Sequence, residues 1–164
     1  MTETCNIEQA VRSNLETLGI QYEWLVVDPK FADTAVFCEK YGYSASHSGN
    51  TIIVASKRGF PKFSACLILA TERLDVNKKV RSLMQVSRLS FASEEATTRL
   101  TGMMLGGVTP FGLPEAVPIY VSSNVMRTDY VILGGGSRSA KIKIVPEEIL
   151  KICGSSVIED LSIH

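Results

Sequence analysis

The chain has 164 residues, of which 45% are hydrophobic and 21% charged, an ordinary globular composition that argues against extensive disorder. Lysine plus arginine and aspartate plus glutamate both number 17, so the chain lacks the basic excess of a stand-alone nucleic-acid binder. No apolar run approaches the ~20 residues of a membrane span, and the polar start MTETCNIEQA is not a signal peptide. We therefore expect one cytosolic domain over residues 1–164, with neither a membrane nor DNA as partner. Any RNA would have to be bound through a local patch, a short contact or an assisting protein.

The first part of the chain predicts helices and strands in short succession. Asn6-Ile-Glu-Gln9 has the form of a capping box for a helix that Gly19 ends. Caps, turns and β-branched runs predict the following elements: a strand at 22–27, a helix at 33–41, strands at 51–55 and 63–70, a helix at 76–84, a strand at 88–91 and a helix at 93–100. The turn Lys57-Arg-Gly59 lies between two of these strands, so we expect residues 50–55 and 63–70 to pair as an antiparallel hairpin.

The second part begins with a long loop over residues 101–114 that contains four glycines and two prolines. Strands are predicted at 118–122, 130–133 and 140–145, and Pro146 opens a final helix over 147–152. In the last strand, alternation places Lys141 and Lys143 outward and the two isoleucines inward. About seven strands that occur in runs favour an α+β fold around one mixed sheet. We expect that sheet to hold the hairpin and all three C-terminal strands.

Two glycine-rich loops, Gly102 to Gly112 and Gly134 to Gly136, are the main candidates for a functional site. Glycine lets the backbone approach a ligand closely, and its N–H groups can hold a carboxyl group or a developing oxyanion. One such loop could be only a tight turn, but two in a short chain indicate a pocket. Neither has the spacing of a P-loop or a Rossmann fingerprint. The chain has only two histidines and four widely spaced cysteines, which are few ligands for a metal site. We therefore expect neither a metal nor a cofactor.

The stretch TGMMLGGVTPFGLP, followed by PIYVSS and YVILGGGSRSAKIKIVPEEILKI, resembles the YbaK/prolyl-tRNA-synthetase-associated domain family. The upstream segments NTIIVA and ERLDVNKKVRSLM agree, so the resemblance spans nearly the whole chain. It implies a single α/β domain around a mixed, barrel-like sheet, and hydrolysis of the ester of a wrongly charged tRNA, often tRNA-Pro carrying alanine or cysteine. The chain looks like a free-standing, trans-editing member. Its implied partners are the 3′ end of aminoacyl-tRNA and an assisting synthetase or elongation factor.

The resemblance also implies which residues form the site. In this family the loop after the TG pair lies beside the scissile ester, which gives a catalytic role to Gly102. The same comparison implies a set of substrate-binding residues around it: Thr51, Met103, Gly106, Gly107, Pro110, Phe111, Gly134, Gly135, Gly136 and Ser137. Met103 and Phe111 are equally well explained as core residues.

The most important departure from the family is Asn50, where many members have a lysine that contacts the tRNA terminus. An amide donates and accepts hydrogen bonds but carries no charge. Two functions therefore stay open: a deacylase that works mainly through backbone groups with Asn50 at its catalytic site, or a non-catalytic module that binds aminoacyl-tRNA or a synthetase. Lys57, Lys62, Lys141 or Lys143 could replace the charge, but each is expected to be a solvated surface lysine.

Overall fold

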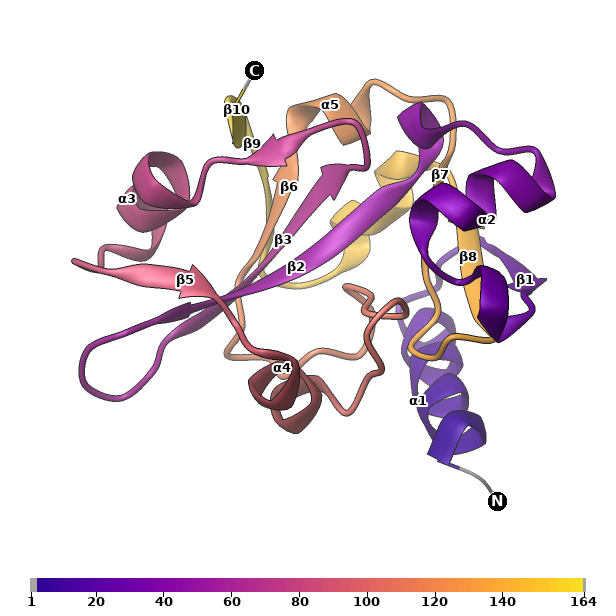
Figure 1. Ribbon diagram of the computed structural model, residues 1–164, viewed down its shortest axis with the longest axis horizontal. Helices are drawn as coiled ribbons and strands as arrows, with labels where there is room; N and C mark the ends of the chain where they lie inside the picture. The colour runs from indigo at the N-terminus through magenta and orange to yellow at the C-terminus, as the bar shows by residue number, and fades with distance from the viewer. Residues whose placement is uncertain (1–2, 164) are drawn as a thin grey trace.

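The computed structural model describes residues 3–163, which form a larger sheet, a smaller sheet and a further pair of short strands, with helices around them (Figure 1). The elements in chain order are α1 (Glu3–Thr17), β1 (Glu23–Val26), η1 (Pro29–Phe31), α2 (Thr34–Tyr41), η2 (Ala45–His47), β2 (Gly49–Ser56), β3 (Phe63–Leu69), β4 (Arg73–Leu74), η3 (Val76–Val80), α3 (Arg81–Met84), β5 (Leu89–Phe91), α4 (Glu94–Thr101), β6 (Ile119–Ser122), α5 (Ser123–Met126), β7 (Val131–Gly134), β8 (Ala140–Ile144), η4 (Pro146–Lys151), β9 (Ser155–Ile158) and β10 (Ser162–Ile163). The predicted α+β class is confirmed.

The larger sheet has the strand order β5-β2-β3-β6-β9. Its centre is the predicted hairpin, in which β2 and β3 pair antiparallel with Asn50 opposite Ile68 and Ala55 opposite Phe63. β5 is antiparallel to β2, whereas β6 and β9 continue the sheet in parallel. The sheet is therefore mixed, as predicted. The apolar, β-branched composition of β2 and β3 suits strands that are covered on both faces.

The prediction that all C-terminal strands join this sheet is wrong for two of them. β7 and β8 pair with β1 in a separate antiparallel sheet of order β1-β8-β7, where Trp24 lies opposite Ile142. Within residues 3–163, the two sheets are bridged at Ser48 and Ile132, and the strands do not close into a barrel. The alternation of apolar and polar residues in β7 and β8 could not show which sheet they join, because the same alternation suits an edge strand of either sheet.

A shared core holds the two sheets together. It includes Val11 and Leu15 of α1, Leu67 of the larger sheet, and Leu133 and Ile142 of the smaller sheet. α1 already includes Glu3, so the predicted capping box is wrong and Asn6 lies inside the helix. No helix within residues 3–163 is both long enough and apolar enough to span a bilayer.

A second apolar cluster lies on the other face of the hairpin, beneath η3 and α3. Val54 of β2 and Leu89 of β5 pack there with Val80 and Met84. This packing fixes η3 and α3 beside the hairpin, at the end of the molecule opposite the smaller sheet (Figure 1).

Candidate functional site

A cavity of about 260 Å³ lies where the start of β2 meets the two glycine loops and the start of α2. It is lined by Ala32, Asp33, Thr34, Gly49, Asn50, Thr51, Ile52, Leu105, Gly106, Val108, Gly134 and Lys141. The structure thus brings together four of the residues predicted for the site, namely Asn50, Thr51, Gly106 and Gly134. Because the walls include both β2 and β8, the cavity is at the junction of the two sheets.

Two polar side chains from β2 enter the lining with unused hydrogen-bonding capacity. Asn50 Oδ1 accepts a hydrogen bond of 2.9 Å from Thr34 Oγ1, while its amide nitrogen has no partner among residues 3–163. Thr51 Oγ1 is buried and also has no partner within that range. An unsatisfied buried hydroxyl costs about 1–3 kcal/mol. Because this oxygen has almost no exposed surface, it is out of reach of a molecule in the cavity, and Asn50 is the residue of the two that can contact a ligand.

Lys141 is buried, with only 7% of its surface exposed, so its predicted position on the surface is wrong. Its Nζ lies 5.0 Å from the ring centroid of Phe37, and none of the ion pairs within residues 3–163 includes it. Burial lowers the pKa of this ammonium below its ordinary value; the charges of Cys38 and Asp33 oppose that shift and the charge of Arg138 adds to it. The cavity therefore contains a partly desolvated cation without a carboxylate in contact.

Alternation along β8 mispredicted Lys141 because the smaller sheet is covered on both faces. Ile142 packs into the shared core, and the opposite face is covered by an apolar cluster of Val27, Phe37 and Ile132. Lys143 on that face is only half-buried, and its Nζ lies 4.6 Å from the centroid of the Tyr130 ring. The helix α2 thus covers Lys141 with Phe37, so that this lysine lines the cavity and is not on the surface.

The two glycine loops are hydrogen-bonded to each other. Met104 donates to the carbonyl of Gly136 at 3.0 Å, and Gly136 donates to the carbonyl of Gly107 at 2.6 Å. A Cβ on Gly107 would collide with the backbone of Ser137, and a Cβ on Gly134 would meet the carbonyl carbon of Gly107 at 2.8 Å. These glycines are therefore required for close packing between the loops, and most of their polar groups are used in it.

Gly106 differs from its neighbours because its N–H has no hydrogen-bond partner in the described part of the chain. It lines the cavity and has a left-handed backbone, with φ of +85°. A side chain there would collide with the guanidinium of Arg138. Gly106 is thus the loop glycine whose amide remains available to a ligand.

The other predicted residues lie outside this cavity. Gly102 is the left-handed C-cap of α4, and its amide donates to Thr98 at 2.8 Å. Met103 and Phe111 belong to the shared core, and Pro110 is also buried. Ser137 donates to Glu8 of α1 at 2.6 Å. The remaining loop glycines have packing roles, since a Cβ on Gly135 would meet Ala140 at 2.9 Å and one on Gly136 would meet Ile7 at 2.7 Å.

Two charged residues at the site were missed in the sequence. Arg138 donates to Asp33 Oδ1 at 3.1 Å, to the carbonyl of Leu105 at 3.3 Å and to that of Pro29 at 3.1 Å. It therefore ties the start of α2 to the first glycine loop. The hydrogen bond from Arg138 holds the pKa of Asp33 below its ordinary value. The sequence predicts Asp33 only as the first residue of the helix at 33–41, because a pairing over 105 positions leaves no local pattern. The position of Arg138 directly after GGGS is the one local signal.

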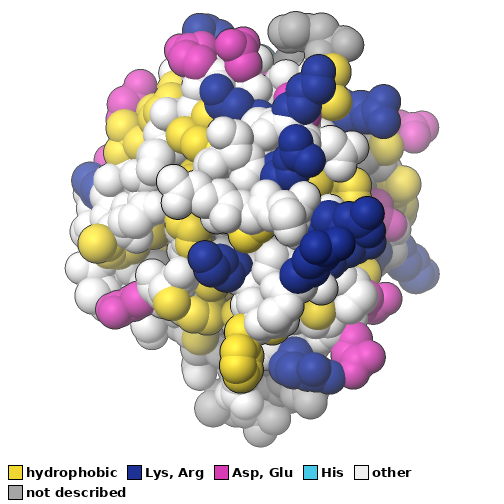
Figure 2. Space-filling view, turned by 90° about the vertical axis from the view of Figure 1, so that its left-hand side faces the viewer, with side chains coloured by type: hydrophobic (Ala, Val, Ile, Leu, Met, Phe, Trp, Pro, Cys, Tyr) yellow, Lys and Arg dark blue, Asp and Glu magenta, His cyan; other side chains and the backbone are white. Residues whose placement is uncertain are grey.

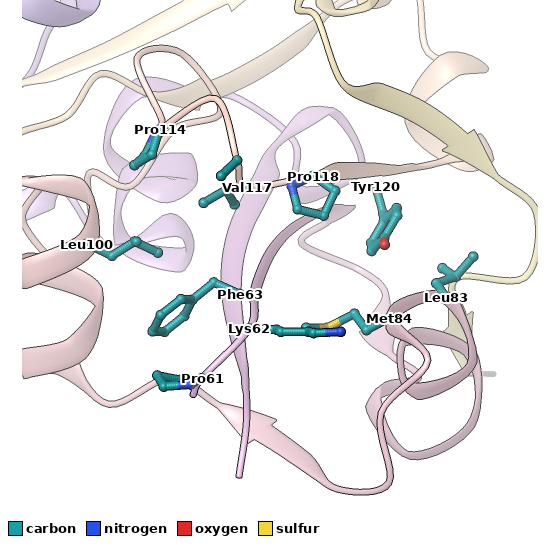
Figure 3. A pocket seen from close by; sticks show the side chains of 11 residues that line it. Pro61, Lys62, Phe63, Leu83, Met84, Leu100, Pro114, Val117, Pro118 and Tyr120 are labelled. Carbon is teal, nitrogen blue, oxygen red and sulfur yellow. The ribbon is translucent and has the colours of Figure 1, made fainter. Parts of the chain in front are cut away.

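A second and larger cavity, of about 430 Å³, lies between α3, α4 and the far end of the hairpin (Figure 3). Phe63, Met84, Pro118 and Tyr120 border it, with Lys62 at its edge. It is mainly apolar and lacks the glycine loops and the buried cation. Cys66 nearby is not a nucleophile candidate, because burial raises the pKa of its thiol to about 12. Residues 3–163 contain no cluster of three or more His, Cys, Asp or Glu that could hold a metal. We therefore take the smaller, polar cavity as the candidate site.

Comparison with known proteins shows a family whose matched range contains both cavities. Residues 28–152 match the family described as the aminoacyl-tRNA editing domain, and this range includes every residue that lines the smaller cavity. The chain is 25% identical over 123 residues to EbsC of Enterococcus faecalis, a proposed Cys-tRNA(Pro)/Cys-tRNA(Cys) deacylase, covering 74% of this chain and 72% of EbsC. It is 31% identical to YwhH of Bacillus subtilis over 85 residues, which is 52% of this chain and 54% of YwhH. A solved structure of a proposed trans-editing enzyme for prolyl-tRNA synthetase superposes with a TM-score of 0.82 at 23% identity, covering 96% of this chain and 97% of that one.

Proposed function

The chain belongs to the aminoacyl-tRNA editing domain family, and from that premise we propose that it is a free-standing, cytoplasmic deacylase that edits mischarged tRNA in trans. The observation that carries the proposal is the composition of the cavity. A buried cation, Lys141, and an unpartnered backbone amide, Gly106, line the same small space. Both groups are of the kind that stabilises a developing oxyanion.

Hydrolysis of an aminoacyl ester needs little covalent help from the protein. Water attacks the carbonyl carbon, and the tetrahedral oxyanion collapses with cleavage of the bond to the ribose oxygen. One proton of the water passes to the ribose oxygen, which leaves as a hydroxyl, and the other is released to solvent as the amino acid leaves as a carboxylate. The ester is already reactive, so the site mainly has to position the reactants and stabilise the developing negative charge. In the proposed mechanism, the Lys141 ammonium and the Gly106 N–H perform the second task.

The remaining polar groups fit the positioning of the amino acid. The unused amide nitrogen of Asn50 can donate a hydrogen bond to the attacking water. Asp33 adds a carboxylate at the cavity wall, and the hydrogen bond from Arg138 holds its pKa below the ordinary value, so that it remains ionised near neutral pH. A negative group at this position suits the positively charged amino group of an aminoacyl ester. Gly102 has no direct role in this proposal, because it caps α4 outside the cavity.

The cavity of about 260 Å³ has room for an amino acid. Alanine or cysteine would fit together with the attacking water, and we propose tRNA-Pro as the carrier because the name of EbsC includes Cys-tRNA(Pro).

The proposal is tested by single-turnover deacylation of a panel of mischarged tRNAs by the purified chain. We expect hydrolysis of Ala-tRNA(Pro) or Cys-tRNA(Pro) well above the spontaneous rate, with Pro-tRNA(Pro) left intact. A chain that is inert on the whole panel but still binds an aminoacyl-adenosine analogue would contradict the deacylase and indicate a binding module.

A further inference from the structure

The neutral net charge of the chain conceals a marked separation of charge. Residues 57–88 contain eight of the 17 Lys and Arg residues but two of the 17 Asp and Glu residues, which leaves six positive charges. The rest of the chain has nine cations and fifteen carboxylates, and so carries six negative charges. Seven of these cations, which we call the basic surface, lie on the hairpin tip and on the elements packed beside it: Lys57, Arg58, Lys62, Lys78, Lys79, Arg81 and Arg88.

At the hairpin tip, three of these cations surround one hollow of about 220 Å³. Arg58, Lys62 and Arg88 line it together with Ser56, Phe60, Val86 and Ser87, and no carboxylate is part of the lining. Figure 2 views the molecule from this side and shows Lys and Arg side chains clustered there, with acidic side chains mostly at the margin.

None of the ion pairs formed among residues 3–163 includes a cation of the basic surface. The contrast is with Arg99, Arg127, Arg138 and Lys151, each of which has a carboxylate partner. The backbone beneath the hollow is nevertheless fixed, because Lys57 donates to the carbonyl of Arg88 at 3.0 Å and Ser56 to that of Lys62 at 2.9 Å. An ordered backbone that presents several uncompensated cations around a concave space is suited to an anionic ligand.

The basic surface continues from the hollow along η3 and α3, which carry Lys78, Lys79 and Arg81. These elements are anchored by Val80 and Met84 in the cluster that also contains Leu89 of β5, so the additional cations keep a fixed position relative to the hairpin. Phe60 at the tip is 97% exposed, which adds an aromatic face beside the cations. Cations next to an exposed aromatic ring are a common feature of RNA-binding surfaces.

The hollow is on the same strand as the candidate site. Asn50 lines the cavity and Ser56 lines the hollow, and an even separation along β2 places both side chains on the same face of the sheet. Six residues of extended strand span ~20 Å. A single phosphate or nucleotide cannot occupy both places, whereas a nucleic acid with its end in the cavity can.

We propose that the basic surface binds the phosphate backbone of the double-helical acceptor arm of the tRNA whose 3′ end occupies the cavity. The identity of this RNA and its double-helical form rest on the proposed function; the anionic, extended character of the ligand rests on the charge separation and the spacing. Phosphate contacts of this kind position the RNA and contribute affinity that falls with salt.

The test compares two triple variants that change the net charge equally. Arg58→Gln/Lys62→Gln/Arg88→Gln removes the cations of the hollow, and Arg99→Gln/Arg127→Gln/Lys151→Gln removes three exposed cations elsewhere. Fluorescence anisotropy measures the Kd for an acceptor-stem minihelix ending in CCA at several salt concentrations. We expect the hollow variant to bind at least about tenfold more weakly, with a salt slope shallower by about two to three. Equal weakening by both variants, or no change in the hollow variant, would overturn the proposal.

Two further probes separate the alternatives. A single-stranded CCA oligonucleotide should bind the hollow variant and the wild type alike, because it is too short to leave the cavity and reach the hairpin tip. Anionic phosphatidylserine vesicles test a membrane instead of RNA: vesicle binding that depends on the three cations, together with minihelix binding that does not, would overturn the proposal. Thermal unfolding of both triple variants verifies that they are folded.

Failure of this proposal can be distinguished from failure of the deacylase. If the surface binds the acceptor arm, kcat/KM of the hollow variant should fall more on a mischarged minihelix than on aminoacyl-adenosine. A wild type that hydrolyses no mischarged tRNA, yet loses minihelix affinity in the hollow variant, would refute the deacylase and leave the surface assignment standing.

Discussion

Cations from neighbouring elements lie near both ends of β2, in opposite environments. Near the start of the strand, Lys141 of β8 is 7% exposed, beside the ring of Phe37. At the far end, Arg58, Lys62 and Arg88 are exposed around an open hollow. A desolvated charge acts strongly over a short distance, whereas exposed charges are screened beyond about 8 Å at physiological salt. The first arrangement suits the stabilisation of one developing charge, and the second suits attraction of a polyanion.

The role of the buried cation is tested most directly by replacing Lys141. Lys141→Met keeps the length of the side chain and removes the charge, so we expect the single-turnover deacylation rate to fall by about 10²–10³, the effect of losing one oxyanion-stabilising group. The loss of rate should be similar at low and high salt, whereas the loss of minihelix affinity in the hollow variant should depend on salt. Lys143→Met on the same strand is the matched control and should stay within about threefold of wild type. Equal rates for Lys141→Met and wild type would remove Lys141 from the proposed mechanism.

A second comparison concerns the glycines at the two ends. Gly107→Ala should destabilise the protein by about 1–3 kcal/mol, because the new Cβ collides with the backbone of Ser137. Gly59 at the hairpin tip has φ of +70°, and no neighbouring atom lies within 4 Å of the position that a Cβ would take there. Gly59→Ala should therefore cost only the strain of that backbone, about 1 kcal/mol. Urea unfolding measures both values. A smaller loss for Gly107→Ala than for Gly59→Ala would contradict the packing of the two loops.

The pH dependence of stability tests whether Lys141 is a buried cation. Burial lowers the pKa of its ammonium below the ordinary 10.5, so the unfolded chain binds this proton more tightly than the folded chain. The stability of the wild type relative to Lys141→Met should therefore be lowest below the folded pKa and should rise as the pH increases toward 10.5.

The activity should change in the opposite direction over the same interval. Deprotonation removes the charge, so the ratio of the wild-type rate to the Lys141→Met rate should fall as the pH rises. Urea unfolding and single-turnover assays across this range measure the two trends. A rate ratio that stays constant up to pH 10.5 would show that the charge of Lys141 does not contribute.

The smallest effect is expected at Asn50. Asn50→Ala removes the hydrogen bond with Thr34 but no charge, so the deacylation rate should fall by only about threefold to tenfold. Asn50→Asp is a useful companion, because a carboxylate close to the same cavity should oppose the oxyanion and slow the reaction further. A loss at Asn50→Ala as large as that at Lys141→Met would shift the main catalytic contribution to the amide.

The sequence predicted local structure better than it predicted the site. The β2–β3 hairpin and the helix predicted at 93–100 follow from neighbouring residues, and the structure contains both. The assignment of β7 and β8 to a second sheet depends on β1, which pairs with β8. Every residue of β1 lies more than a hundred positions before its partner in β8, so this pairing leaves no local signal. Lys141 is buried because α2 covers β8, and the pattern of residues along β8 alone does not reveal that cover. The charge separation, by contrast, was visible in the sequence and was hidden by the sum over the whole chain.

The position of the cavity between the two sheets has a consequence for the whole molecule. Asn50 and Thr51 belong to the larger sheet, Gly134 and Lys141 to the smaller one, and the backbone bridge between the sheets is that of Ser48 and Ile132. A molecule that fills the cavity contacts both sheets at once and resists their separation. By mass action, a ligand at 100 times its Kd stabilises the state that binds it by about 2.7 kcal/mol. Occupancy of the site would thus act as a non-covalent cross-link between the two halves of the fold.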